Sequence, residues 1–175
     1  MTSTILIAAF STILVAVAGG VLTKLTPWYY ALRFPSWKPP DWLFGPAWTV
    51  ILSLACAASV IGWDNAPDMA YRRLVVLLFT ANGVLNAVWS LFYFRLKRPD
   101  WALIEVCALQ LINVALFVTL YPISHTAAWC MAPYIVWVAF ASYLNLTIVR
   151  LNGPFGRGDI LTPLLQAAFK DPRHV

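Results

Sequence analysis

The chain has 175 residues, of which 61% are hydrophobic, and only 19 charged side chains (12 Lys and Arg, 7 Asp and Glu), whereas soluble domains are about 45–50% apolar. This composition excludes an ordinary water-soluble domain, and the 26 aromatic residues (nine Trp, seven Tyr, ten Phe) exclude a disordered chain. Three cysteines in so long a chain do not make a disulfide scaffold, and the alternating strands of a membrane β-barrel are missing from the pattern.

The apolar residues form five blocks, each long enough to cross a bilayer as a helix. An α-helix rises about 1.5 Å per residue, so about 20 residues cross the hydrocarbon core while the helix satisfies its own backbone hydrogen bonds. The predicted spans are 5–22, 43–63, 74–94, 101–121 and 127–149. We therefore predict an all-α integral membrane protein, a five-transmembrane-helix bundle that forms one domain over residues 1–152.

The two ends of the chain leave alternatives open. Ala16-Val17-Ala18 resembles a signal-peptidase site, but residues 1–4 carry no positive charge and the apolar run is too long, so we expect the first span to be kept. In the C-terminal tail, 153–175, apolar residues recur at helical spacing between 160 and 169. A short helix lying on the membrane and a disordered tail are equally compatible with this pattern.

Basic residues are distributed unequally between the two ends of the predicted spans. Arg72 and Arg73 lie at one end. The other end carries Lys24, Arg33, Lys38, Arg95, Lys97, Arg98, Arg150 and Arg157. Because cytoplasmic loops carry the excess of Lys and Arg, we predict that the first loop and the C-terminus face the cytoplasm. This asymmetry and the attraction to anionic lipid account for the net charge of +5, so we predict membrane lipid and not nucleic acid as a partner.

Residues for enzyme chemistry are scarce. His125 and His174 have no motif partners, and the three cysteines fall in three different spans without metal-ligand spacing, so we predict no metal site and no required cofactor. Glu105 lies about one turn inside the fourth span. We favour the interpretation that its side chain reaches back toward Lys97 and Arg98 at the headgroups, over that of a buried functional acid.

Tryptophans on three different spans reach similar depths. Counted at about 1.5 Å per residue from the predicted cytoplasmic end, Trp48 and Trp89 lie about 8 Å deep, Asn86 and Ala141 about 12 Å, and Trp137 about 18 Å. The remaining six tryptophans lie in the first loop or at span ends, as an aromatic belt does.

Two helical stripes contain all of these residues except Trp48. The first, Asn82, Asn86, Trp89 and Tyr93, lies on one face of the third span, and the second, Pro133, Trp137, Ala141 and Asn145, lies on the fifth. Buried amides need partners, so the first stripe should face inward, either to bond neighbouring helices or to contact a ligand. Together the stripes predict an aromatic-walled pocket, with a packed bundle core as the alternative.

The loop between the first two spans is aromatic, basic and stiffened by four prolines, which suits a lid over the cytoplasmic end. Arg33 and Lys38 are candidates to bind the carboxylates of a ligand there. They serve equally well as anchors to lipid headgroups.

With these residues described, the sequence resembles the tryptophan-rich sensory protein / translocator protein family, also called the peripheral benzodiazepine receptor family, over about residues 5–152. The matching segments are Pro35-Ser36-Trp37, Pro39-Pro40, Trp42, Phe44-Gly45-Pro46, Trp48-Thr49, Leu85-Asn86, Trp89-Ser90, Phe94, Pro133-Tyr134, Trp137, Phe140-Ala141 and Leu144-Asn145. The sequence departs from the family at Phe34, where lysine is common, and at Thr147, where the sterol-recognition segment has tyrosine.

The resemblance implies five clockwise-packed helices, often paired as homodimers, and a pocket beneath the first loop that binds porphyrins such as protoporphyrin IX, sterols, and isoquinoline or benzodiazepine drugs. It places Trp48, Asn86, Trp137 and Ala141 in the pocket lining. The complete set of predicted ligand-binding residues is Tyr29, Trp37, Pro40, Phe44, Trp48, Asn82, Asn86, Trp89, Trp137 and Ala141.

Three functions follow as hypotheses. The first is a membrane receptor or sensor that binds a planar apolar ligand such as a porphyrin, which is then a ligand and not a cofactor. The second is an enzyme that degrades porphyrin with light and oxygen, as the resemblance to bacterial relatives suggests. The third is a transporter of tetrapyrroles or sterols, against which the missing internal repeat and missing midplane charges count.

Overall fold

The computed structural model describes residues 2–156, and this part of the chain is helical and contains no strand. Five helical segments are long and apolar enough to cross a membrane: Thr2–Leu22, Asp41–Asn65, Met69–Arg95, Pro99–Leu120 and His125–Asn152. The predicted fold, a five-helix membrane bundle, is confirmed. The stretch between 160 and 169, with which a short interfacial helix and a disordered tail are equally compatible, lies outside the described residues.

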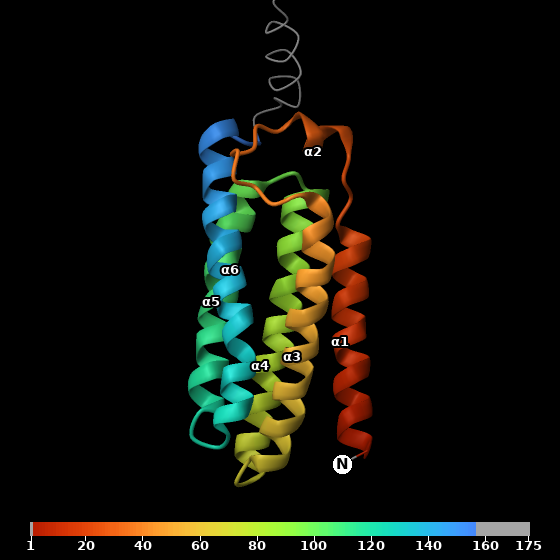
Figure 1. Cartoon of the computed structure of the whole chain (residues 1–175), viewed down its shortest axis with the longest axis vertical. Coiled ribbons are helices and arrows are strands. Elements are labelled where there is room, and N and C mark those ends of the chain that lie inside the picture. Colours follow the sequence, from red (N-terminus) through yellow and green to blue (C-terminus); the bar gives the residue numbers. More distant parts are fainter. Residues whose placement is uncertain (1, 157–175) are drawn as a thin grey trace, which may run out of the picture.

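The elements follow one another along the chain with short connections. They are α1 (Thr2–Leu22), α2 (Pro27–Ala31), η1 (Asp41–Leu43), α3 (Phe44–Asn65), α4 (Met69–Ser90), η2 (Leu91–Arg95), α5 (Pro99–Leu120) and α6 (His125–Asn152). Figure 1 shows α2 and its loop at one end of the bundle, and the N-terminus at the other.

Local signals in the sequence explain where several helices begin. The carboxylate of Asp68 accepts a hydrogen bond from the Tyr71 amide at 2.7 Å and caps α4, and Ser124 caps α6 in the same way. Pro99 occupies the first turn of α5, where its missing N–H costs nothing. Because of the Asp68 cap, α4 begins five residues before the apolar block that starts at Leu74, so hydropathy located the lipid-buried part and not the whole helix.

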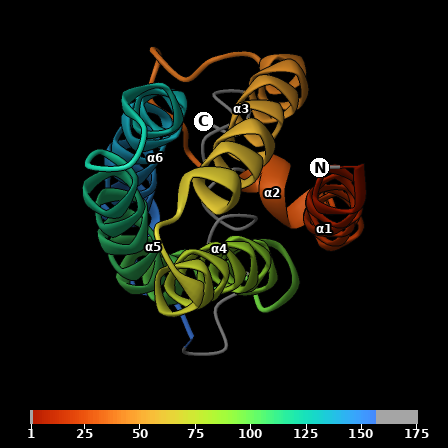
Figure 2. The same ribbon diagram turned by 90° about the horizontal axis from the view of Figure 1, so that it is seen from below.

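The five long helices form a ring in the order α1, α3, α6, α5, α4, which runs counterclockwise in the view from below in Figure 2. The second and fifth crossings are therefore neighbours, although they are far apart in the sequence. Helix α1 packs on α3 and α4 but has no buried residue, so it is the most lipid-exposed helix of the five.

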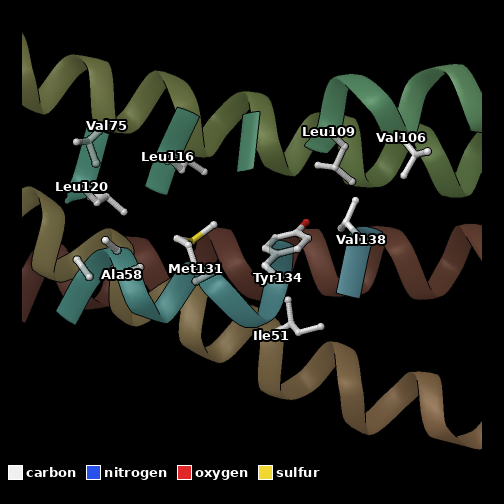
Figure 3. Packing of buried hydrophobic residues seen from close by; sticks show 13 residues of the cluster. Ile51, Ala58, Val75, Val106, Leu109, Leu116, Leu120, Met131, Tyr134 and Val138 are labelled. Carbon is white, nitrogen blue, oxygen red and sulfur yellow. The ribbon is translucent and has the colours of Figure 1, made fainter. Parts of the chain in front are cut away.

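The interior has two apolar clusters. The larger one fills the bundle between α3, α4, α5 and α6, with Met131 and Tyr134 near its centre (Figure 3). The smaller one lies beneath α2 and joins Tyr29 and Leu32 of the first loop to Tyr93, Ala102, Leu144 and Ile148 of the bundle. Trp89 packs against both clusters and so lies at the boundary between them.

Candidate functional site

Three helices each contribute a half-buried tryptophan to the half of the bundle beneath the first loop. Trp48 of α3 packs edge-on against Tyr134 of α6, with ring centroids 5.7 Å apart. Trp89 of α4 stacks on Tyr93 at 5.1 Å. The first of these contacts joins the second and fifth crossings, and the second lies within the third crossing.

Trp137 of α6 lies in an aromatic group of its own. Its ring contacts Phe44, at the start of α3, and Phe140, one turn along α6, each with centroids 5.6 Å apart. Phe44 therefore links the beginning of the second crossing to the fifth. Ala141, one turn beyond Trp137, is likewise half-buried.

The predicted polar stripe of the third span faces the interior, as expected. Asn82 is 5% exposed and donates to the Asn113 side chain of α5 at 2.7 Å. Asn86 is 8% exposed and donates to the Tyr134 hydroxyl of α6 at 2.8 Å. Both amides therefore bond neighbouring helices, one of the two roles predicted for them.

The stripe predicted on the fifth span is correct in part. Asn145 is 1% exposed, and its amide lies 3.1 Å from the Pro99 carbonyl and 3.2 Å from the Leu103 N–H, so it joins α6 to α5. Pro133 is exposed instead of facing inward. The reason is that the buried face of α6 passes through the adjacent Tyr134, which the helical pitch places about 100° around the axis from Pro133.

The first loop covers this end of the bundle through aromatic contacts. Trp28 meets Tyr93 at 6.3 Å between ring centroids, and Tyr29 meets Phe94 at 5.9 Å, so α2 lies on the π-helical turn η2 that ends the third crossing. Trp37 stacks on Tyr143 of α6 at 5.3 Å. The loop is therefore attached to two helices that are not neighbours in the ring, which is the placement expected of a lid.

Trp37 and Pro40 lie at the margin of the site. Trp37 is 43% exposed, and its stacking partner Tyr143 is exposed as well, so this pair lies on the outer side of α6. Pro40 is also exposed and precedes the first turn of η1. Neither residue is enclosed by the bundle interior.

The lid contains a charged cluster made of Lys38, Asp41 and Tyr29. Lys38 pairs with Asp41, and its ammonium lies 4.8 Å from the centre of the Phe34 ring. The Tyr29 hydroxyl donates to the Asp41 carboxylate at 2.7 Å. Burial raises the pKa of the Tyr29 phenol, and the bond to Asp41 raises it further, so the phenol remains a donor. Lys38 is thus already engaged within the lid.

A second attachment holds the lid at Arg33. The Asn152 side chain, at the end of α6, accepts from the Arg33 backbone N–H at 2.7 Å and donates to the Arg33 carbonyl at 2.9 Å. This pair satisfies both backbone groups of one loop residue. We call it the Asn152 latch.

Two residues near the site differ from the sequence reasoning, which gave Tyr134 no role and turned Glu105 toward the headgroups. Tyr134 is 1% exposed and contacts both Trp48 and Asn86; its position one turn before Val138 on the buried face was the available signal. Glu105 is 7% exposed, so the expectation that it reaches the headgroups is wrong: its side chain lies on the face of α5 that packs into the bundle. Within residues 2–156, no cluster of three or more His, Cys, Asp or Glu could hold a metal ion.

Comparison with known proteins identifies the family. The model of the TspO/MBR family matches residues 6–151, which include all five crossings and the lid. The chain belongs to the TspO/MBR family. It is 37% identical to the tryptophan-rich protein TspO of Chlorobaculum tepidum over 142 residues, which cover 79% of this chain and 89% of that protein.

Other members of the TspO/MBR family are similar over comparable lengths of the chain. The tryptophan-rich protein TspO of Archaeoglobus fulgidus is 36% identical, covering 77% of this chain and 88% of the relative. The human translocator protein is 32% identical, covering 71% of this chain and 75% of the relative. Trp48, Asn86, Trp137 and Ala141 all lie within the region that matches the TspO/MBR family.

Proposed function

We propose that this TspO/MBR protein is a membrane receptor that binds planar apolar ligands of the tetrapyrrole class, such as protoporphyrin IX, beneath the first loop. One observation carries the proposal: tryptophans of three crossings lie half-buried under a lid, and the indole N–H of Trp89 is enclosed without a hydrogen-bond partner among residues 2–156. Buried donors normally have partners, so an unpaired one among aromatic rings favours a ligand group.

The proposed binding mode assigns different roles to the rings and to the lid. The flat face of a tetrapyrrole stacks on Trp48 and Trp137, as aromatic rings do when they are offset or edge-on. Its carboxylates lie toward the basic end, near Lys38 and Arg33. Lys38 then exchanges its pairing with Asp41 for pairing with the ligand, which couples ligand binding to the arrangement of the lid.

Tryptophan fluorescence of the purified protein in detergent tests this proposal. We expect protoporphyrin IX to quench the emission saturably and the double variant Trp48→Leu/Trp137→Leu to bind it at least about tenfold more weakly, because two stacking surfaces are lost. Trp129→Leu is the control, since Trp129 is exposed at the opposite end of the bundle. Equal affinity in the double variant and the wild type would contradict the proposed site.

The role of the lid cation is tested with a second ligand. Protoporphyrin IX dimethyl ester has the same ring but no free carboxylate. Lys38→Met should weaken binding of the diacid and leave binding of the ester unchanged, because only the diacid gains from the ammonium. Loss of affinity for both ligands would mean that Lys38 acts only through the structure of the lid.

A further inference from the structure

The carboxyl group of Glu105 has no partner in the bundle. The residue is 7% exposed, and both of its carboxylate oxygens are enclosed without a hydrogen-bond donor among residues 2–156. The ion pairs in this part of the chain are Lys38–Asp41 and Arg98–Asp100, so neither includes Glu105. A carboxyl group buried without partners costs several kcal/mol as an anion, so the neutral acid is the form that these surroundings permit.

The fold provides partners for the other buried amides on the same faces. Asn82 bonds Asn113, Asn86 bonds Tyr134, and Asn145 bonds the backbone at the start of α5. The first and third contacts join α4 and α6 to α5, the helix that carries Glu105, and the second joins α4 to α6. Asn113 Nδ2 and Gln110 Oε1 of α5 are also unpaired, but each of these amides keeps one hydrogen bond, whereas Glu105 has none. This difference indicates that the acid has a role other than holding helices together.

Glu105 borders the aromatic site. It is buried on the face of α5 between Ala102 and Val106, and these two residues pack in the two apolar clusters that Trp89 joins. Glu105 is six residues from the start of α5, and Trp89 is six residues from the end of η2 at the same end of the bundle, so each lies about 9 Å deep. The unpaired acid and the unpaired indole N–H therefore share one depth on neighbouring helices.

We propose that Glu105 is the residue that recognises a basic ring nitrogen of the ligand. The proposal rests on the function proposed above and specifies the polar group that such a ligand presents. The neutral acid donates its O–H to the lone pair of an imine-type nitrogen. If the proton transfers, the O–H bond breaks, an N–H bond forms, and a carboxylate is left beside the cation it has made. In these apolar surroundings that ion pair is strong.

Two probes of equal shape test the proposal. Acridine is a planar tricycle with one basic ring nitrogen, and anthracene has C–H at that position. Both are titrated into the protein in the same non-ionic detergent, with tryptophan quenching as the readout. Acridine also reports its own protonation, because the emission of acridinium differs from that of acridine. The measurement is made at a pH at which free acridine is neutral.

Three variants accompany the wild type. Glu105→Leu removes all polar contact, and Glu105→Gln retains a donor but cannot transfer a proton. Asp64→Asn also removes one carboxyl group, but at the exposed end of α3 far from the lid, so it controls for the loss of a carboxyl group outside the site. We expect the preference of the wild type for acridine over anthracene to fall about tenfold in Glu105→Leu and to be unchanged in Asp64→Asn.

The outcomes separate this inference from the proposed function. Acridinium emission in the wild type that disappears in Glu105→Gln supports proton transfer from Glu105. Saturable binding of both probes with the same preference in the wild type and Glu105→Leu overturns the role of Glu105, while the aromatic site stands. If neither probe nor protoporphyrin IX quenches saturably, both the site and the inference are wrong.

Discussion

The interior of the bundle contains polar side chains on α4, α5 and α6 that lie opposite one another in pairs. The Asn82–Asn113 and Asn86–Tyr134 bonds each join two crossings, at 2.7 and 2.8 Å. Bonds of this kind in membranes contribute about 0.6 kcal/mol on average, and they matter because an unpaired group in the same place is costly. Glu105 is an unpaired group of this kind, and the cost of burying it can be measured as a change in the stability of the protein.

Glu105→Leu is expected to stabilise the ligand-free protein. The substitution replaces an unpaired buried carboxyl by an apolar side chain of similar size, so we expect a gain of about 1–3 kcal/mol. Thermal unfolding in detergent, followed by tryptophan emission, measures this gain as a higher Tm, and Asp64→Asn should leave the Tm unchanged. A lower Tm for Glu105→Leu would show that the acid has a structural partner.

The energy of the Asn86–Tyr134 hydrogen bond distinguishes the two roles predicted for Asn86, which are bonding a neighbouring helix and contacting a ligand. A double-mutant cycle with Asn86→Leu and Tyr134→Phe should give a coupling energy of about 0.5–1.5 kcal/mol in the ligand-free protein, because each single variant leaves one buried group unpaired. The free energies of unfolding are measured by denaturant titration in detergent. Additive effects of the two substitutions would mean that the bond contributes nothing to stability and that Asn86 is available to a ligand.

At the scale of the elements, the sequence located the crossings because hydropathy reports which residues lie in lipid. It did not give the ends of the helices, since the Asp68 cap of α4 and the Ser124 cap of α6 extend them beyond the apolar blocks. Helical periodicity correctly predicted that Asn82 and Asn86 face inward, but it could not identify Asn113 and Tyr134 as their hydrogen-bond partners. Periodicity gives the face of a helix, whereas the partner depends on which helices are neighbours in the ring.

The same limit explains why the sequence predicted a lid but not its attachment. Prolines and aromatic residues between 24 and 42 indicated a stiff cover, yet Arg33 and Asn152 are 119 residues apart and belong to no common motif. The cation of Lys38 was predicted to be open to a ligand, and the partner that holds it, Asp41, lies only three residues farther along the chain. Short-range charge pairing within a loop is the signal that would have indicated this contact.

Asn152→Ala is expected to loosen the lid without unfolding the bundle. The variant loses both hydrogen bonds to the Arg33 backbone, while the aromatic contacts of Trp28 and Tyr29 with the bundle remain. Amide hydrogen exchange over residues 24–40 should become about fivefold faster, as a loss of about 1 kcal/mol implies. Asn65→Ala, which removes a side-chain bond at the end of α3, is the control. Unchanged exchange in the lid would show that its aromatic contacts alone hold it.

At the scale of the whole molecule, the fold confirms the segregation of charge that the sequence indicated. Within the described residues, seven basic side chains lie at the lid end: Lys24, Arg33, Lys38, Arg95, Lys97, Arg98 and Arg150. Arg72 and Arg73 lie at the opposite end, in the first turn of α4. Both Asn152, which latches the lid, and Tyr93, on which α2 rests, belong to the basic end. The ligand entry that we propose and the attraction to anionic lipid therefore both take place at the lid end of the bundle.

The unequal distribution of basic residues between the two ends of the bundle predicts the orientation of the protein in the membrane. Because Lys and Arg near the ends of spans are retained in the cytoplasm, the lid and the end of α6 should face it. In a bacterial host, green fluorescent protein fused after residue 152 should fluoresce and alkaline phosphatase fused there should be inactive. Fusions after Asp68, between α3 and α4, should behave in the opposite way. Replacing Arg72 and Arg73 by Gln increases the charge asymmetry, so this variant should show the same pattern of fluorescence and phosphatase activity. Active phosphatase after residue 152 in the wild type would place the lid, and the ligand entry that we propose beneath it, on the other side of the membrane.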